Sequence, residues 1–529
     1  MKRVSSNNLG TQANTVGGAT GSKDICDMWA EHYKQLLNSC NDFSKKGSVL
    51  EALNDTDSSG FIEYTPVDIK KAISDLKKGK AAGMDNINSE HFIYASSKIS
   101  VFLSMLYNTM LYHGHIPIHL MDTILVSLIK DKRGDIMDKD NYRPIAITTA
   151  ISKILEMVTL NSYYVYLTTG PHQFGFKESH STDLGIFVLK EIISYYNSLS
   201  SPIYACFVDA SKAFDRVNHW YLFDKLLSRG VPKMIVRLLM VWYTMQTFVV
   251  KWDSLISLSF NVSNGVRQGG VLSPILFNLF IEDLSQRLLD TRVGCYMNHV
   301  CFNHINYADD CVLLAPSVPA LQILINVCNS YASQFDMIYN CKKSLCMSFY
   351  PKGFYNSITP NVILGGTCLR WTDQHKYLGV NISCDSKDDI DIKRQCKAIY
   401  SRGNMLIRKF KTCSDNVKCQ LFKSYMSNLY CGQLWSNYSS RTFKRVKVAY
   451  NNVCRSLFSL KRDCSISKHY VDNNIHGFDS LLRIYINSFS KRILVCDNLL
   501  VSTVANSTYF IYKSKLFSKW VSLTHSLHV

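Results

Sequence analysis

The chain has 529 residues, of which 47% are hydrophobic, and a formal net charge of +18. This hydrophobic content excludes a largely disordered chain, and the length allows several buried cores in two to four domains or subdomains. The longest apolar stretch, residues 238–250, contains polar residues and is too short to span a bilayer, so we expect no membrane association. The polar N-terminus lacks the apolar core of a signal peptide, which predicts an intracellular protein, nuclear or cytoplasmic, that is not secreted.

The eighteen cysteines are scattered along the chain, and no two of them have the Cys-x-x-Cys spacing. Disulfide frameworks belong mainly to secreted chains, and structural zinc sites need closely spaced ligands. We therefore expect reduced thiols in the core, without a structural zinc site.

The N-terminal part of the chain contains a polar segment followed by a predicted helix. Residues 1–22 are rich in Asn, Ser, Thr and Gly and are expected to be flexible. The next segment, 23–60, begins with apolar residues at helical spacing, among them Ile25, Trp29 and Tyr33. This spacing predicts an amphipathic helix that opens an N-terminal helical extension.

Four short motifs precede residue 200. They are KKGKAAGMDNI at 77–87, LIKDKRGD at 128–135, NYRPIAI at 141–147 and HQFGFKESHSTDL at 172–184. Each motif alone is moderately specific, so their order along the chain matters more than any single match.

A buried strand is predicted at residues 203–209, where an apolar run ends in the carboxylate of Asp209. A strand that ends in this way can bring its carboxylate beside a turn of a neighbouring strand. The chain continues through Phe214 and Asp215 toward a predicted helix, and Asp215 is expected to cap that helix.

A glycine-rich loop and a helix follow at residues 265–280. The loop reads Gly-Val-Arg-Gln-Gly-Gly, and its glycines allow a close approach of the backbone and unusual φ angles. Ser273 is a good N-cap and Pro274 a good first helical residue, and apolar residues then repeat at helical spacing.

The tetrapeptide Tyr307-Ala308-Asp309-Asp310 lies between two apolar stretches that fit β-strands. Two adjacent carboxylates at a strand turn are costly unless positive charge lies nearby. A pair of divalent cations supplies that charge in polymerases, where two metal ions stabilise an in-line phosphoryl transfer. The alternative interpretation is a solvated Asp-Asp hairpin turn, which is common.

The motifs together resemble one family. In order, they are the four motifs above, FVDASKAFDRVNH at 207–219, GVRQGGVLSPILFN at 265–278, YADD at 307–310 and KYLGV at 376–380. This series is similar to the reverse transcriptases of non-LTR (LINE-type) retrotransposons, and the resemblance covers roughly residues 25 to 480.

The resemblance implies an α+β fold of the right-hand polymerase type. It places the fingers at residues 61–200 and the palm, an antiparallel sheet backed by helices, at 201–385. A basic helical thumb would occupy 386–480, and the last segment, 481–529, is expected to form a helical tail without a recognisable motif.

The resemblance also implies the reaction and its metal ligands. Asp209 and Asp309 would bind two Mg²⁺ ions, for which Mn²⁺ is a possible substitute, and Asp310 would assist in the same site. The enzyme would join deoxynucleoside triphosphates to a DNA primer on an RNA template.

Several other residues match nucleotide-binding positions of the family. Lys130 and Arg143 would hold the incoming triphosphate, because a guanidinium binds phosphate in a bidentate manner; the alternative is a solvated charge. Phe214 would exclude a 2′-hydroxyl from the sugar site, and its alternative role is palm core. The loop residues that would line the template base and the nucleotide are Arg267, Gln268 and Gly269. Lys343 is a candidate proton donor to pyrophosphate, and Lys342 is an equal one.

The positive charge is concentrated after the predicted palm. Residues 391–470 contain 17 Lys or Arg and three Asp or Glu, which gives this segment a charge of +14 (17 − 3). Such a concentration favours a polyphosphate partner over a solvated surface. Within the segment we expect Lys444, Arg445 and Lys447 to contact the backbone of the primer–template duplex.

Three functions stay open from the sequence. The first is an active RNA-directed DNA polymerase, as the polymerase part of a longer polyprotein or as a truncated copy. The second is an inactive or domesticated copy that only binds nucleic acid. The third is a protein similar to group II intron maturases. The intact carboxylates favour the first.

Overall fold

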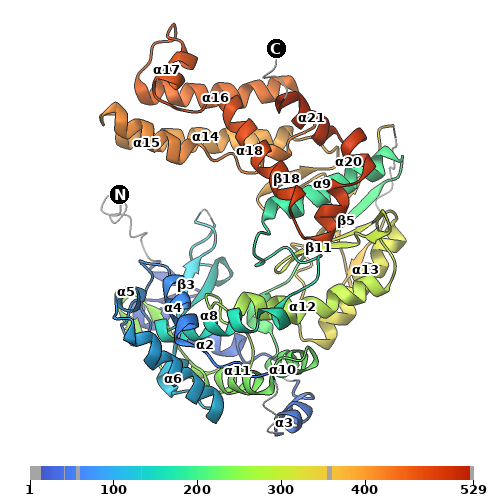
Figure 1. Ribbon diagram of the computed structural model, residues 1–529. Coiled ribbons are helices and arrows are strands. Elements are labelled where there is room, and N and C mark those ends of the chain that lie inside the picture. Colours follow the sequence, from blue (N-terminus) through green and yellow to red (C-terminus); the bar gives the residue numbers. More distant parts are fainter. Residues whose placement is uncertain (1–12, 41, 55–59, 133, 354–359, 525–529) are drawn as a thin grey trace. The chain divides into compact units, whose positions relative to one another are not determined.

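The computed structural model describes residues 13–40, 42–54, 60–132, 134–353 and 360–524. These residues form two compact units, each built from separate stretches of the chain (Figure 1). The first unit comprises residues 1–170, 210–284 and 330–338, and the second comprises 171–209, 285–329 and 339–529. The sequence predicts the fingers, palm and thumb as three continuous stretches of the chain. These boundaries stay a prediction.

The first unit begins with a small hairpin and an amphipathic helix. Strands β1 (Thr15–Val16) and β2 (Ala19–Thr20) pair where a flexible segment was expected, because the side chain of Val16 is fully buried in the core. Residues 1–12 of that expected flexible segment lie outside the described residues. Helix α2 (Ser22–Leu36) follows and buries Ile25, Trp29 and Tyr33, as its spacing predicts.

A mixed sheet with the order β4-β3-β6-β7 forms the centre of the first unit. Its strands are β3 (Thr123–Ile129), β4 (Tyr142–Ile147), β6 (Thr247–Trp252), β7 (Leu255–Ile256) and β8 (Phe260–Asn261), which pairs with β6. β3 and β4 are antiparallel, whereas β3 and β6 are parallel. The apolar face of α2 packs on this sheet, because Trp29 and Tyr33 share one core with Leu125 and Val250.

Helices make up most of the remaining first unit. They are α3 (Lys46–Asn54), α4 (Pro66–Ser74), α5 (Ser89–Ile93), α6 (Lys98–His113), α7 (Ile118–Met121), α8 (Ala150–Ser162), α10 (His219–Ser228), α11 (Lys233–Met245) and the first part of α12 (Ser273–Asp290). Helix α12 begins at Ser273, one residue before the first helical residue that the Ser-Pro pair predicts, and the Ser273 hydroxyl forms no capping hydrogen bond among the described residues.

The second unit is built on a five-stranded sheet with the order β11-β12-β5-β13-β16. The strands are β11 (His304–Tyr307), β12 (Asp310–Ala315), β5 (Ile203–Asp209), β13 (Leu345–Phe349) and β16 (Arg370–Trp371). All neighbouring pairs are antiparallel except β13 and β16. Small hairpins accompany the sheet: β9 (Tyr296–Met297) with β10 (Val300–Cys301), β14 (Ile363–Leu364) with β15 (Thr367–Cys368), and β17 (Gln374–Tyr377) with β18 (Val380–Ser383).

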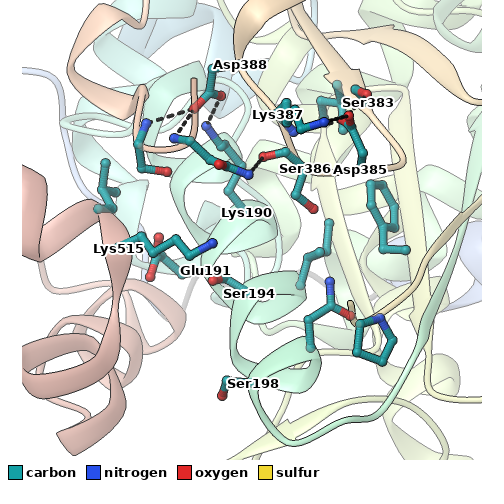
Figure 2. A pocket seen from close by; sticks show the side chains of 18 of the residues that line it. Lys190, Glu191, Ser194, Ser198, Ser383, Asp385, Ser386, Lys387, Asp388 and Lys515 are labelled. Atoms are coloured by element: carbon teal, nitrogen blue, oxygen red, sulfur yellow. Dashed lines mark hydrogen bonds and ion pairs between the residues drawn. The ribbon is translucent and has the colours of Figure 1, made fainter. Parts of the chain in front are cut away.

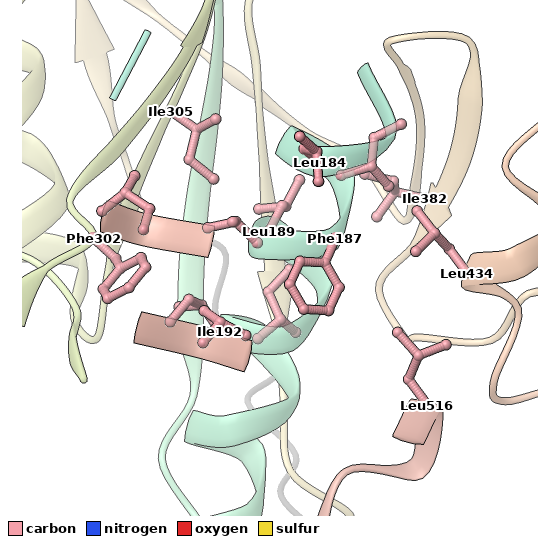
Figure 3. Packing of buried hydrophobic residues seen from close by; sticks show 14 of the residues in the cluster. Leu184, Phe187, Leu189, Ile192, Phe302, Ile305, Ile382, Leu434 and Leu516 are labelled. Atoms are coloured by element: carbon pink, nitrogen blue, oxygen red, sulfur yellow. The ribbon is translucent and has the colours of Figure 1, made fainter. Parts of the chain in front are cut away.

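One hydrophobic core joins this sheet to helices on its face. Helix α9 (Thr182–Ser198) buries Leu184, Phe187 and Ile192 against β11 and its neighbours (Figure 3). Residues 318–329 of α13 (Val318–Gln334) belong to the same unit. The C-terminal helices are α18 (Phe478–Leu494), α19 (Leu499–Ala505), α20 (Thr508–Lys513) and α21 (Lys515–Thr524). They enter this core through side chains such as Leu516. The predicted helical tail is therefore part of the folded unit.

The basic segment folds as a helical layer with its own core. It contains α14 (Asp389–Phe410), α15 (Asp415–Met426), α16 (Ser440–Phe458) and α17 (Ile466–Asp472). Their apolar faces meet in a cluster that includes Ile399, Leu406 and Phe422. The eighteen cysteines are free thiols, in agreement with the sequence, and no helix among the described residues is long and apolar enough to cross a membrane.

Helices α14 and α16 approach most closely at Gly403. A Cβ atom added there would lie 2.5 Å from both methyl groups of Val453, a side chain with little rotamer freedom. We predict that Gly403→Ala lowers the free energy of unfolding by about 1–3 kcal/mol, the usual cost of overpacking. Thermal unfolding would measure it.

The matched control for this substitution is Gly47→Ala. Gly47 lies in α3 with no atom within 4 Å of an added Cβ, so the substitution should be neutral or stabilising by up to about 1 kcal/mol. Adding Val453→Ala to the Gly403 variant should restore part of the lost stability. Equal stability of the Gly403 and Gly47 variants would show that the two helices can separate at no cost.

Candidate active site

Three carboxylates meet at one end of the sheet of the second unit. In the register of β5 and β12, Asp209 lies directly opposite Asp310. Tyr307 pairs with Asp310 in the adjoining hairpin, so Ala308 and Asp309 form its two-residue turn. The structure therefore brings together the three acidic residues that the sequence identified.

The loop that contains Gln173 is hydrogen-bonded to this turn. The side-chain oxygen of Gln173 accepts hydrogen bonds from the backbone N–H groups of Ala308, at 2.9 Å, and Gly175, at 2.8 Å. Ala308 has a left-handed backbone (φ 56°), which is uncommon for a residue with a side chain. A Cβ at Gly175 would lie 2.4 Å from the Ala308 nitrogen, so only glycine fits there. The motif at 172–184 thus supports the YADD turn, a role that the sequence did not reveal.

The carboxylates repel each other. Partial desolvation, followed by the negative charges of Asp309 and Asp209, raises the pKa of Asp310 to about 6. Nearby positive charge would relieve this repulsion, since an opposite charge favours the ionised form of a carboxyl group. Carboxylate oxygens are also the ligands that hard divalent cations prefer. The donor set therefore fits the metal ions that reverse transcriptases generally use.

A cavity of about 350 Å³ adjoins the carboxylates. Its lining includes Asp209, Asp310, Lys342, Lys343, Arg370, His375 and Lys376. The Asn340 N–H donates to the Asp209 carbonyl at 2.8 Å, and the Asp209 N–H donates to the Ser344 hydroxyl at 3.0 Å. These bonds fix the lysine pair beside the acidic residues, and both lysines face the same cavity. Arg370 and Lys376 are lining cations that the sequence did not single out; the KYLGV motif, which contains Lys376, was the available signal.

In the first unit, Lys130 and Arg143 lie on the β3–β4 hairpin. Arg143 is exposed opposite Leu128, and Lys130 follows the end of β3. The Lys130 N–H donates to the Asn141 carbonyl at 2.7 Å, and its ammonium donates to the Asp140 carbonyl at 3.0 Å. Both cations are thus presented to solvent by a regular hairpin.

The glycine-rich loop of the first unit is tied to the same hairpin. The Ala146 N–H donates to the Gln268 carbonyl at 2.7 Å. Gly269 has a φ of +128°, and a Cβ there would lie 2.5 Å from the Ala146 carbonyl oxygen, so this glycine is required for the close approach. Gly269 itself is exposed.

The structure corrects the expectation for Arg267. Its side chain is only 1% exposed, pairs with Glu156 at 2.5 Å and lies over the Trp242 ring at 4.4 Å. Two backbone N–H groups, of Val271 and Leu272, also donate to Glu156. Arg267 therefore supports the loop from within the core, and its neighbours Gln268 and Gly269 remain the more exposed members of the predicted set.

Asp215 does not cap the following helix, in contrast to the prediction. Helix α10 is capped by Asn218, which accepts from the N–H groups of Trp220 and Tyr221. Asp215 is instead buried, and its carboxylate accepts a 2.8 Å hydrogen bond from the Gln268 amide. Burial is the main reason why the pKa of Asp215 rises to about 6.

Phe214 and the three cations expected to bind a duplex lie in different environments. Phe214 is half-buried and stacks on Phe277, with ring centroids 4.3 Å apart. On α16, Lys444 and Arg445 are exposed, whereas Lys447 forms an ion pair with Asp479. The three cations expected to bind a duplex are therefore not equivalent.

The buried Asp215 carboxyl predicts a pH-dependent difference between the wild type and Asp215→Asn. Its folded-state pKa of about 6 lies above the ordinary value of 3.8, so ionisation opposes folding. Wild-type stability should fall, relative to the variant, as the pH rises from about 4 to 6, by up to about 3 kcal/mol, and the difference should stay constant above that range. Urea unfolding at pH 4.5 and 7.5 measures this; a constant difference at both pH values would contradict it.

Comparisons with known proteins agree with this geometry. Residues 129–382 match the model of the reverse transcriptase (RNA-dependent DNA polymerase) family. The RNA-directed DNA polymerase from the mobile element jockey of Drosophila funebris is 27% identical over 387 residues, which are 69% of this chain and 41% of that protein. The probable RNA-directed DNA polymerase from transposon BS of Drosophila melanogaster is 23% identical over 446 residues, 80% of this chain and 48% of the relative.

The chain spans about half the length of the curated relatives it matches. Among solved structures, apo telomerase from Candida tropicalis is similar with a TM-score of 0.41 and 10% identity, over 82% of this chain and 72% of that one. The mixed sheets and helices, together with the family match, confirm the predicted α+β class of the right-hand polymerase type. Residues 129–382 are thus a reverse transcriptase domain, and the chain is similar to the RNA-directed DNA polymerases of the mobile element jockey and of transposon BS.

Proposed function

We propose that the protein is an RNA-directed DNA polymerase that extends the 3′-hydroxyl of a DNA primer on an RNA template. The observation that supports this most directly is the strand register that sets Asp209 opposite Asp310, with Asp309 in the adjoining turn. Adjacent carboxylates that repel each other are suited to bind divalent cations at the point of phosphoryl transfer.

Asp209 and Asp309 would hold two Mg²⁺ ions, and Asp310 would assist them. When bound, such ions stabilise the attacking and the leaving oxygens of an in-line displacement, and Mn²⁺ could replace them. The protein's own contribution is to fix the carboxylates on rigid strands, so that little reorganisation is needed during the reaction.

The incoming deoxynucleoside triphosphate would be bound by residues of the first unit. Arg143 and Lys130 offer exposed cations for its phosphates, and Gln268 and Gly269 belong to a rigid loop suited to contact base and sugar. Phe214 would exclude the 2′-hydroxyl, with its stacking on Phe277 keeping the ring in place. Arg267 would act only by supporting the loop.

Lys343, or Lys342 beside it, would donate a proton to the leaving pyrophosphate. Both line the cavity next to Asp209, which supports this role for either. An ammonium group is a suitable general acid when its charge is needed near a developing anion. Single substitutions to Gln would separate the two.

A primer-extension assay tests the proposed function. Purified protein is given a poly(A) template, an oligo(dT) primer, dTTP and Mg²⁺. Products that lengthen with time, and that need both the RNA template and the metal, are expected. Nucleic-acid binding without any incorporation, in Mg²⁺ or Mn²⁺, would instead support the alternative of an inactive copy.

Loss of one carboxylate should abolish incorporation while leaving duplex binding intact. We predict that Asp209→Asn and Asp309→Asn each lower the rate of single-nucleotide addition by about a thousandfold or more, because each removes a metal ligand that contributes several kcal/mol to transition-state stabilisation. Rapid-quench measurement gives the rate, and fluorescence anisotropy gives duplex affinity. Asp290→Asn, on the exposed face of α12, is the matched control. Near wild-type rates in either active-site variant would disprove the assignment.

The salt dependence of duplex binding should identify which thumb cations bind phosphate. Affinity should fall with salt by a log–log slope of roughly −0.9 per phosphate bound on B-form DNA. We predict that Lys444→Gln with Arg445→Gln flattens this slope by about two units and shortens the products, with single-nucleotide addition less affected.

Lys447→Gln is the comparison for the thumb variants. Because Lys447 is paired with Asp479, its substitution should change the slope by less than about one unit. An unchanged slope and unchanged product lengths in the double variant would mean that α16 is only a solvated surface.

A further inference from the structure

A second cavity in the second unit shares no lining residue with the one beside the carboxylates. It has a volume of about 460 Å³, within the range of roughly 300–1,000 Å³ that is usual for ligand sites. Helix α9, the loop from β18 to α14, and the ends of α20 and α21 surround it (Figure 2). It is therefore a separate site, with its own chemistry.

The wall formed by α9 is polar and contains an unsatisfied carboxyl group. Glu191, Ser194 and Ser198 follow one another at helical spacing along this wall (Figure 2). Glu191 is 3% exposed, and one of its oxygens, Oε2, has no hydrogen-bond partner among the described residues. Burial raises the pKa of Glu191 to about 7, while the Ser514 hydroxyl binds the carboxyl group. A buried polar atom without a partner is costly, so a ligand that satisfies it would gain affinity.

The wall formed by the loop from β18 to α14 is held by hydrogen bonds and ion pairs, although the Ser386 hydroxyl has no hydrogen-bond partner among the described residues. Asp388 accepts hydrogen bonds from the backbone N–H groups of Ser436, at 2.7 Å, and Asn437, at 2.9 Å, and it pairs with Lys190 at 2.6 Å. Lys387 pairs with Asp385 at 3.1 Å. These pairs shape the cavity but offer little charge to a ligand.

The remaining cations give the cavity an anion-binding rim. Lys352, Lys513 and Lys515 line it and are exposed, and none of them has an ion pair within the described part of the chain. The cavity is also lined by apolar side chains, including Phe349 and Leu516, and by the ring of Tyr350. It therefore offers a ligand cations, apolar side chains and one unsatisfied carboxyl oxygen.

We propose that this cavity binds one nucleotide of single-stranded RNA, with its phosphate at Lys513 and Lys515 and a base or ribose donor at Glu191. A nucleotide carries the anion, the planar ring and the hydrogen-bond donor that the three parts of the cavity need. A polymer is favoured over a free nucleotide because Ser436 and Asn437 of the cavity precede α16, whose first two turns carry Arg441, Lys444 and Arg445, whereas the first turn of α14 carries Asp389 and Asp391. The proposal rests on the proposed function only in taking RNA as the partner.

Fluorescence anisotropy of a labelled single-stranded RNA on the full chain tests this site. Lys513→Gln with Lys515→Gln should weaken binding about tenfold and flatten the salt slope by about 0.7 for each phosphate that is no longer neutralised. Lys491→Gln with Lys519→Gln removes the same charge outside the cavity and is the control.

A substitution at Glu191 tests the wall of the cavity that is formed by α9. Glu191→Gln keeps the shape of the side chain but replaces one oxygen with an NH₂ group. It should weaken binding about tenfold, because only one acceptor oxygen remains, and when that oxygen accepts from the Ser514 hydroxyl the NH₂ group faces the ligand's donor. The salt slope should stay unchanged, since the number of phosphates neutralised by the protein is the same.

Competition with AMP, GMP and UMP distinguishes a polymer from a free nucleotide. Displacement only at concentrations far above those of an RNA oligonucleotide supports the polymer; equal displacement, sensitive to the same substitutions, would overturn RNA in favour of a free nucleotide.

Photocrosslinking with 4-thiouridine RNA should label peptides of α9 or α20–α21. Unchanged affinity in the Glu191 and lysine variants, whose folding is checked by thermal unfolding, would overturn the site. Because these readouts do not need incorporation, the site can fail or succeed independently of polymerase activity.

Discussion

The pairing of β5 with β12 is the constraint on which the candidate active site depends. Side chains alternate along a strand, so a slip of one residue would move Asp310 to the other face of the sheet and remove it from its place opposite Asp209. The slip is prevented by the core, because Val312 and Leu314, which pair with Phe207 and Ala205 of β5, would have to leave it. The hydrophobic packing of the second unit therefore determines where its negative charges meet.

Each loop of the candidate site is supported by groups that do no chemistry themselves. In the second unit, Gln173 accepts one hydrogen bond from the backbone N–H of Ala308, in the turn of the acidic residues, and one from that of Gly175 in its own loop. In the first unit, the buried pair of Arg267 and Glu156 holds the glycine-rich loop. Both supports act through buried hydrogen bonds, and removal of one partner leaves the other buried and unsatisfied. We expect substitutions at these positions to alter activity through geometry.

The second unit carries cations at two places, on the helices of the basic segment and around the cavity at α9. The helices of the basic segment expose cations such as Lys444 and Arg445, which we propose to contact the backbone of a duplex of any sequence, because phosphate contacts carry no sequence information. The cavity at α9 combines cations with the buried carboxyl of Glu191, and this combination can discriminate between ligands. We therefore propose that the second unit contains both a surface that contributes affinity for a duplex and a cavity that discriminates between ligands.

The sequence by itself determined the acidic residues, the amphipathic α2, the α+β class and the basic helical segment, because each depends on local pattern or on the order of motifs. It could not reveal that Arg267 is buried against Glu156, that Asn218 and not Asp215 caps α10, or that Asp479 pairs with Lys447. The cavity at α9 was equally hidden, since its walls come from five separate segments. Most of these facts depend on residues that are far apart in the chain. Only the tertiary structure determines which residue a charged side chain contacts.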